Sequence, residues 1–246
     1  MNLIIDIGNT LSKCYLFDGE TLMRTFHEEG HELMLLDSLD IRPEATIVAS
    51  VVDISPEARC RLEHLGGRLM YFTSLTPTPL TNRYHTPATL GADRLAAAVG
   101  AWTQRPGQPL LIIDAGSCIT FDFVNPEGEY IGGNIAPGMH ARLKAIDDYF
   151  PRLPLVDAEG DIPELGYDTP TAIRAGVIQG MRHEIEGYIS HFRKKYPTLL
   201  VFLTGGDVNR LAKTQTSRTF ADEFLVARGL NAILEHSLAL AQASLP

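Results

Sequence analysis

The chain has 246 residues, of which 45% are hydrophobic and 21% charged, a composition typical of a soluble protein with one large domain or two smaller ones. Its formal net charge of −9 argues against non-specific nucleic-acid binding, which needs a basic surface. The sequence shows no basic leader and no apolar stretch of membrane-spanning length, and its three cysteines lack CxxC spacing. We therefore expect a cytoplasmic protein with no membrane or nucleic-acid partner.

The first part of the chain is predicted to form a sheet followed by two helices. Asp18-Gly19 is a hairpin turn signal, and Ser55-Pro56 is typical of a helix N-terminus. Residues 74–90 are rich in Pro and Thr and lack periodicity, which indicates a linker or a functional loop. We expect strands at residues 2–7, 11–17, 21–26, 46–52 and 69–73, and helices at 56–65 and 91–104.

The Pro- and Gly-rich segment at residues 105–109 predicts a domain joint. It divides the chain into an N-terminal lobe, residues 1–105, and a C-terminal lobe, residues 106–246. The last helix of the C-terminal lobe could pack against either lobe. We expect strands at residues 110–114, 118–124, 130–135 and 199–204, and helices at 138–149, 170–195 and 222–241.

A strand, an Asp-x-Gly turn, a second strand, a turn and a third strand occur twice, about 108 residues apart. The turns are Asp6-Ile7-Gly8 and Asp114-Ala115-Gly116. Glycine permits a tight turn and lets a phosphate approach backbone N–H groups, while the aspartate can hold Mg²⁺. Each turn alone is equally compatible with a plain hairpin. Their repetition favours phosphoryl transfer, which depends on positioning and charge neutralisation.

This duplicated pattern resembles the superfamily of acetate and sugar kinases, Hsp70 and actin. The resemblance implies an α/β fold of two duplicated actin-like ATPase (ribonuclease H-like) lobes, each a mixed sheet flanked by helices, with an ATP cleft between them. Thr204-Gly205-Gly206-Asp207 fits the adenosine-side loop of that superfamily, although a glycine turn after a strand explains it equally well.

Three further segments resemble type III pantothenate kinases. Residues 84–95 match the pattern Tyr, two residues, Pro, two residues, Leu-Gly-x-Asp-Arg of the pantothenate site. Residues 132–138 resemble the Gly-Gly-x-Ile-x-Pro-Gly segment, and residues 169–176 resemble the Thr-x-x-Ala-x-x-x-Gly segment. The resemblance covers almost the whole chain in the correct order.

The resemblance implies ATP-dependent phosphorylation of pantothenate to 4′-phosphopantothenate, the first step of coenzyme A biosynthesis. Asp93 would be the general base, because a carboxylate can accept the proton of an attacking hydroxyl, and the adjacent Arg94 favours its anionic form. The alternatives are a kinase-like accessory regulator or binding protein, which needs no such base, and a sugar or acetate kinase, which would have a different acceptor loop.

The family's other roles transfer position by position. Asp6 would hold Mg²⁺ with ATP, and Asp114 a monovalent cation, K⁺ or NH₄⁺. Thr169 would complete the pantothenate site of a neighbouring subunit in a homodimer. ATP and phosphate contacts are expected from Asp6, Ile7, Gly8, Asn9, Thr10, Leu11, Ser12, Lys13 and Ser117. Pantothenate contacts are expected from Tyr84, Gly91, Ala92, Asp93, Arg94 and Thr169.

Two positions depart from the family pattern. Ser117-Cys118 replaces the usual Thr-Ala but keeps the hydroxyl, and Asp53 replaces a proline. His27-Glu28-Glu29-Gly30-His31 satisfies the H-E-x-x-H pattern of zinc proteases, which requires a continuous helix. Because Gly30 lies inside it and a strand precedes it, we interpret this segment as the exit from a hairpin and the start of a helix rather than as a metal site.

Overall fold

The computed structural model describes residues 1–8, 10–211 and 218–243. The chain divides into two compact units, which we describe one at a time. The first unit consists of Met1–Pro106, Gly128–Tyr130 and Phe224–Pro246, and the second consists of Gly107–Glu127 and Ile131–Glu223. No described helix has the length and apolar character needed to cross a membrane.

The first unit contains a mixed five-stranded sheet in the order β3-β2-β1-β4-β5. β1 pairs antiparallel with β2 and parallel with β4, so it lies at the centre of the sheet. The predicted strands are confirmed, with β3 three residues longer than expected. The strands are β1 (Asn2–Ile7), β2 (Leu11–Asp18), β3 (Thr21–Glu29), β4 (Ala45–Ser50) and β5 (Arg68–Tyr71).

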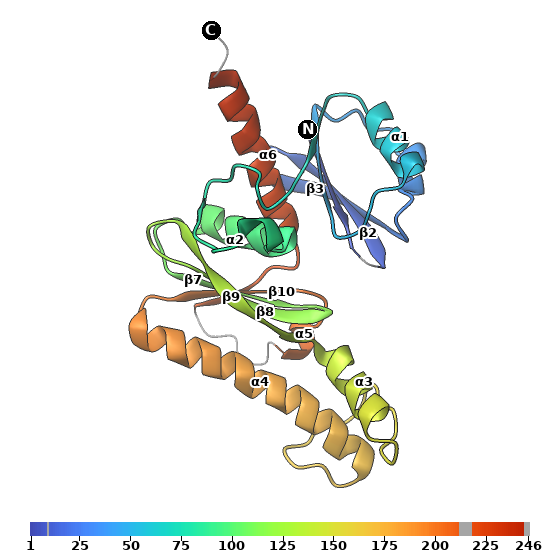
Figure 1. The fold of residues 1–246 in the computed structure, drawn as a ribbon, viewed down its shortest axis with the longest axis vertical. Helices are drawn as coiled ribbons and strands as arrows, with labels where there is room; N and C mark the ends of the chain where they lie inside the picture. The colour runs from blue at the N-terminus through green and yellow to red at the C-terminus, as the bar shows by residue number, and fades with distance from the viewer. Residues whose placement is uncertain (9, 212–217, 244–246) are drawn as a thin grey trace. The chain divides into compact units, whose positions relative to one another are not determined.

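Helices of the first unit pack against apolar side chains of its sheet. The 3₁₀ helix η1 (Met34–Ser38) and α1 (Pro56–His64) contribute to the core around Leu3, Ile5 and Ile7. α1 begins as predicted, because the Ser55 side chain accepts a hydrogen bond from the Ala58 N–H. α2 (Ala92–Gln104) packs against α6 (Leu225–Ala243), which also contacts β1 and β4 (Figure 1).

The second unit repeats this topology, with β9-β8-β7-β10-β11 in the positions of β3-β2-β1-β4-β5. Again the central strand pairs antiparallel with the next strand and parallel with a later one. This agreement explains the sequence repeat. The strands are β7 (Leu110–Ala115), β8 (Cys118–Val124), β9 (Glu129–Pro137), β10 (Leu200–Thr204) and β11 (Thr219–Ala221).

One face of this second sheet packs against the long helix α4 (Thr169–Lys195) and against α3 (Met139–Tyr149), as Figure 1 shows. The side chains of alternate residues, Leu111 and Ile113 among them, point to this core. Both helices were predicted from the sequence within one residue of their observed ends.

Four short elements were not predicted. Two of them lie in the loop at residues 74–90, namely β6 (Thr81–Asn82) and the 3₁₀ helix η2 (Pro87–Thr89). β6 pairs in parallel with Glu129 and Tyr130 at the start of β9. The other two are α5 (Val208–Leu211) and β11. The last helix begins at Leu225 instead of residue 222, because Thr219–Ala221 forms a strand just before it.

Candidate active site

The first Asp-x-Gly turn connects β1 to β2. Asp6 is the penultimate residue of β1 and lies directly opposite Lys13 on β2. The Gly8 N–H donates to the Leu11 carbonyl at 3.1 Å, which closes the turn. Thr10 and Lys13 are exposed, whereas Ile7 and Ser12 are buried, and the Ser12 hydroxyl donates to the Gly30 carbonyl at 2.7 Å. Asn9 lies outside the described residues. Thr10 and Lys13 therefore offer side chains, and the buried residues can offer only backbone groups.

Asp6 has a perturbed acidity. Burial raises the pKa of its carboxyl from 3.8 to about 6, since burial disfavours the charged form. The positive charge of Lys13 opposes this shift, and the negative charge of Asp93 adds to it. Asp6 and Asp93 are 87 positions apart in sequence but close enough in the first unit to interact electrostatically. The structure thus brings the predicted phosphate side and the predicted acceptor side together.

Asp93 lies in the first turn of α2. Gly91 precedes this helix, and the Asp93 Oδ1 accepts a hydrogen bond from the Arg94 N–H at 2.9 Å. Asp93 is exposed. A carboxylate in the first helical turn is stabilised as an anion by the helix dipole. Its exposure and its position next to Asp6 suit a group that must meet a substrate hydroxyl.

Arg94 is buried, in contrast to the surface position that a helix N-terminus would suggest. Its guanidinium carbon lies 5.8 Å from the centroid of the Tyr84 ring, a cation–π contact. Tyr84 also lies beside Tyr130, with ring centroids 6.3 Å apart, and its N–H donates to the Asn82 side chain. Tyr84 and Arg94 are therefore assembled as one group. Tyr130, which the sequence analysis did not select, supports that group from the start of β9.

The second Asp-x-Gly turn connects β7 to β8. Asp114 lies opposite Thr120 on β8 and beside Thr204 on β10. The Gly116 N–H donates to the Cys118 carbonyl at 2.9 Å. Ser117 is exposed, and its carbonyl accepts a hydrogen bond from the Gly138 N–H at 3.1 Å. The Ser117 hydroxyl is thus presented at the surface by a turn whose backbone is fixed.

The loop after β10 packs directly on this second turn. Gly205 has φ +98°, and a Cβ there would lie 2.5 Å from the Asp114 Oδ1. The Asp207 N–H donates to the Ala115 carbonyl at 2.9 Å. Burial raises the pKa of the Asp207 carboxyl, an effect opposed by His140 and Arg210. The His140 Nε2 lies 3.8 Å from the Asp207 Oδ1. This pair was not predicted from the sequence, although the acidic residue after two glycines was a usable signal.

Thr169 is the first residue of α4 and is exposed. The preceding Asp168 caps the helix: its side chain accepts from the Thr171 N–H, and the Thr171 hydroxyl accepts from the Asp168 N–H. Hydrogen bonds that the Asp168 carboxylate accepts from the Thr171 hydroxyl and from the Thr171 N–H lower the pKa of this carboxyl. The capping box fixes where α4 begins and so fixes the position of Thr169.

The H-E-x-x-H segment does not form a helix. His27, Glu28 and Glu29 belong to β3, and the Glu28 carboxylate accepts hydrogen bonds from the Met34 and Leu35 N–H groups. Glu28 therefore caps η1 instead of acting as a catalytic base, and the two histidines share no helical face. Asp53 is exposed between β4 and α1.

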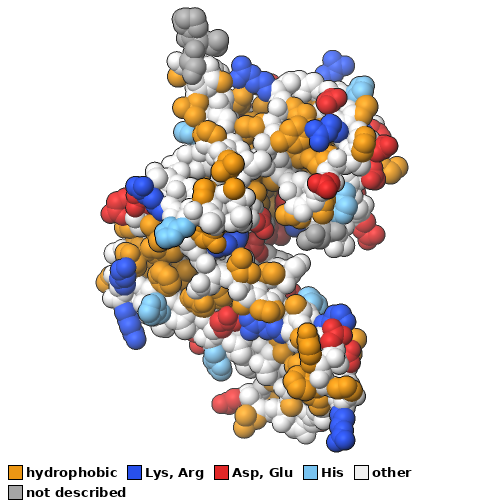
Figure 2. Space-filling model, in the orientation of Figure 1, with side chains coloured by type: hydrophobic (Ala, Val, Ile, Leu, Met, Phe, Trp, Pro, Cys, Tyr) orange, Lys and Arg blue, Asp and Glu red, His pale blue; other side chains and the backbone are white. Residues whose placement is uncertain are grey.

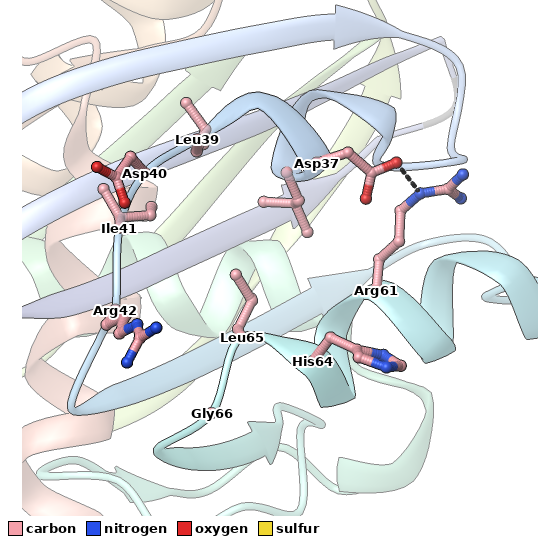
Figure 3. A pocket seen from close by; sticks show the side chains of 10 residues that line it. Asp37, Leu39, Asp40, Ile41, Arg42, Arg61, His64, Leu65 and Gly66 are labelled. Carbon is pink, nitrogen blue, oxygen red and sulfur yellow. Dashed lines mark hydrogen bonds and ion pairs between the residues drawn. The ribbon is translucent and has the colours of Figure 1, made fainter.

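Two surface cavities lie away from these residues. One, of about 470 Å³, lies in the first unit between η1, the loop that follows it and α1, and Arg61 on its wall is held by Asp37 at 2.9 Å (Figure 3). The other, of about 480 Å³, is an aromatic groove in the second unit, beside α4. Neither cavity is lined by any of the predicted site residues.

Several solved structures share the fold of this chain. A structure described as a conserved putative Baf family transcriptional activator from Campylobacter jejuni has a TM-score of 0.61 and 21% identity, covering 96% of this chain and 99% of that one. A ROK hexokinase from Thermus thermophilus has a TM-score of 0.53 and 14% identity, covering 97% and 99%. At such identities the likeness shows only the fold, which is the duplicated α/β fold of actin-like ATPases and sugar kinases, as predicted.

Closer relatives define the family. Residues 2–191 match the family described as type III pantothenate kinase. A protein with that description from Phocaeicola vulgatus is 48% identical over 239 residues, covering 96% of this chain and 99% of the relative. Another, from Porphyromonas gingivalis strain ATCC BAA-308 / W83, is 40% identical over 242 residues, covering 96% and 99%. The chain belongs to the type III pantothenate kinase family, which confirms the resemblance, and is a phosphotransferase that uses ATP with a divalent metal ion.

Proposed function

We propose that this protein transfers the γ-phosphoryl group of ATP to the primary hydroxyl of pantothenate, giving 4′-phosphopantothenate in the first step of coenzyme A biosynthesis. One observation carries the proposal: the exposed Asp93 interacts electrostatically with Asp6 at the phosphate turn, within one compact unit. An acceptor-side base next to a phosphate-binding turn is the arrangement that phosphoryl transfer to an alcohol requires.

On the acceptor side, Asp93 accepts the proton of the pantothenate hydroxyl as it attacks the γ-phosphorus. Tyr84 and Arg94 orient the substrate, and their mutual contact at 5.8 Å supports a shared role. Gly91 and Ala92 offer backbone groups at the start of α2. A positioned general base typically contributes about 10²–10⁴-fold to the rate.

On the phosphate side, Asp6 holds Mg²⁺, while Thr10, Lys13 and the backbone of the turn bind phosphate oxygens. Mg²⁺ is usually bound by one or two carboxylates together with substrate phosphates. A single carboxylate suits that mode, and no described group of three or more His, Cys, Asp or Glu side chains offers a closed metal site. The metal ion supplies charge neutralisation at the transferred phosphoryl group.

In the second unit, Asp114 binds K⁺ or NH₄⁺ and Ser117 contacts ATP. The strand neighbours of Asp114, Thr120 and Thr204, are neutral residues with hydroxyl oxygens, which suits a monovalent cation. Replacing K⁺ with tetramethylammonium should lower the turnover, and an unchanged rate would contradict this site.

The protein acts as a homodimer in which Thr169 completes the partner's pantothenate site. Large hydrophobic side chains are exposed in the segment that leads to Thr169, and Figure 2 shows hydrophobic groups on the surface of this region. Such groups suit burial against a second copy of the chain. The exposed residues are Tyr149, Phe150, Leu155, Leu165 and Tyr167. The cytoplasmic location expected from the sequence stays a prediction.

A coupled assay of ADP release tests the function most directly. We expect pantothenate to stimulate ADP release, and glucose and acetate not to do so. If pantothenate causes no ADP release, the accessory regulator becomes the better interpretation. If glucose or acetate serves as the acceptor, the acceptor assignment of residues 84–95 is wrong.

A further inference from the structure

We propose that the imidazole of His140 is a nucleotide-binding group that contacts the phosphates of ATP and supplies the positive charge of the second Asp-x-Gly turn. The inference rests on the proposed function, since it takes ATP as the ligand of this turn. It adds a residue that neither the motifs nor the family pattern selects.

The fold holds His140 close to the second Asp-x-Gly turn. His140 is the second residue of α3, and Gly138 just before this helix is fixed to the phosphate turn, with its N–H donating to the Ser117 carbonyl. A Cβ at Gly138 would lie only 2.7 Å from the Ser117 carbonyl oxygen, so the backbones are in direct contact. The His140 side chain is 75% exposed. An accessible ring is thus held two residues from the contact with the nucleotide turn.

The buried carboxylate of Asp207 lies beside the His140 ring. Asp207 is only 12% exposed at its side chain, its N–H donates to the Ala115 carbonyl, and its Oδ1 lies 3.8 Å from the His140 Nε2. In a protonated imidazole both ring nitrogens donate hydrogen bonds. With Nε2 facing Asp207, Nδ1–H is left to donate to a phosphate oxygen.

The two Asp-x-Gly turns differ in the charge opposite the aspartate. In the first turn Lys13, opposite Asp6, provides a cation in register. In the second turn the corresponding partner of Asp114 is the neutral Thr120, and residues 114–120 include no Lys or Arg. A polyphosphate bound at this turn would need a cation from elsewhere. His140 is the basic residue that the close packing of α3 brings to it.

The charged groups near His140 support this assignment. On α3 itself, Arg142 is engaged by the Pro137 carbonyl and by Glu184 at 2.7 Å. On α5, Arg210 is engaged by Glu159 and the Ala158 carbonyl. Asp207, in the loop after β10, is the acidic group beside the ring. Both arginines are therefore committed to protein partners, whereas the His140 ring faces solvent on its other side.

Steady-state kinetics of His140→Gln and His140→Lys test the proposal, with His183→Gln, an exposed histidine on α4, as the matched control. We expect His140→Gln to raise the KM for ATP roughly tenfold, the loss of about one charge-assisted hydrogen bond. The KM for pantothenate should stay within about twofold. His140→Lys should restore a low KM for ATP. An unchanged KM for ATP in His140→Gln, or an equal rise in both KM values, would overturn the proposal.

Direct measurement of ATP binding separates a contact with the nucleotide from an effect on turnover. By calorimetry, the affinity for ATP should be roughly tenfold weaker in His140→Gln, restored in His140→Lys and unchanged in His183→Gln. An unchanged affinity in His140→Gln would overturn the proposal. Calorimetry needs no turnover, so the test remains valid if pantothenate proves not to be the acceptor, a result that would refute only the proposed function.

Discussion

The two Asp-x-Gly turns occupy the same place in the same sheet topology, yet they are built differently. In the first, the Gly8 N–H reaches the Leu11 carbonyl, and in the second the Gly116 N–H reaches the Cys118 carbonyl, so the second turn is one residue shorter. The residue opposite the aspartate changes accordingly, from Lys13 to Thr120. The first turn thus provides charge in register and the second provides none.

The surroundings of the two aspartates also differ in charge and packing. The first carboxylate, Asp6, interacts with Lys13 and Asp93, so its pKa depends on nearby charges as well as on burial. The second, Asp114, is approached closely by the backbone of Gly205, and Gly138 packs on the following turn. One topology therefore carries one turn whose carboxylate is governed by nearby charges and one turn that is tightly packed, and the following predictions test that division.

The largest expected effect is on the catalytic side. Asp93→Asn should fold normally but lose at least about 10²-fold in kcat, because the amide cannot accept the proton of the substrate hydroxyl. Steady-state kinetics and circular dichroism measure the two properties. The control is Asp18→Asn, which neutralises an exposed carboxylate in the β2–β3 hairpin and should retain full activity. Near-normal turnover of Asp93→Asn would remove Asp93 from the role of base.

The second prediction concerns packing at the other turn. Gly205→Ala should destabilise the protein by about 2–4 kcal/mol, since φ is +98° and the new Cβ would meet the Asp114 carboxylate. Gly206→Ala is a neighbouring control, because no atom lies within 4 Å of its Cβ position. Urea unfolding gives both values. Equal stability of the two variants would mean that the turn adapts more easily than its packing suggests.

The strands of both sheets were well predicted from the sequence, because they depend on local apolar patterns. The apolar runs at residues 2–7 and 110–114 identify the central strands, and the repeat identifies their equivalence. β6, β11 and α5 have only two to four residues, too few to show a period, and they form through pairing or packing with distant segments.

The site was predictable as a set of residues but not as an arrangement. Nothing local indicates that Asp93 approaches Asp6, because that proximity arises from the packing of α2 within the first unit. The adjacency of Asp93 and Arg94 predicted that the arginine favours the anionic carboxylate, but it gave no sign that the Arg94 guanidinium also lies against the Tyr84 ring. His140 carried no signal by itself, since its relation to Asp207 depends on two elements about 70 residues apart.

The third prediction uses the cost of keeping a charge on Asp6. Between its ordinary pKa of 3.8 and the raised pKa of about 6, the folded protein holds a proton that the unfolded chain releases. The free energy of unfolding should therefore fall as pH rises through this range. Asp6→Asn should be more stable than the parent by roughly 1–3 kcal/mol at pH 7.5, with the gain shrinking towards pH 4. Urea unfolding without nucleotide or Mg²⁺ measures this, and a destabilised Asp6→Asn would contradict it.

The smallest effect is a pair of opposite shifts at the same carboxyl. Lys13 lowers the pKa of Asp6 and Asp93 raises it, so Lys13→Gln should raise that pKa further and Asp93→Asn should lower it. NMR titration of the Asp6 carboxyl in the nucleotide-free protein resolves the two directions, with Asp18→Asn as the variant that leaves it in place. The absence of a shift in both variants would mean that burial alone sets the pKa of Asp6. Opposite shifts would establish that Asp6 and Asp93 form one electrostatic unit, with Lys13 in register where Asp114 has the neutral Thr120.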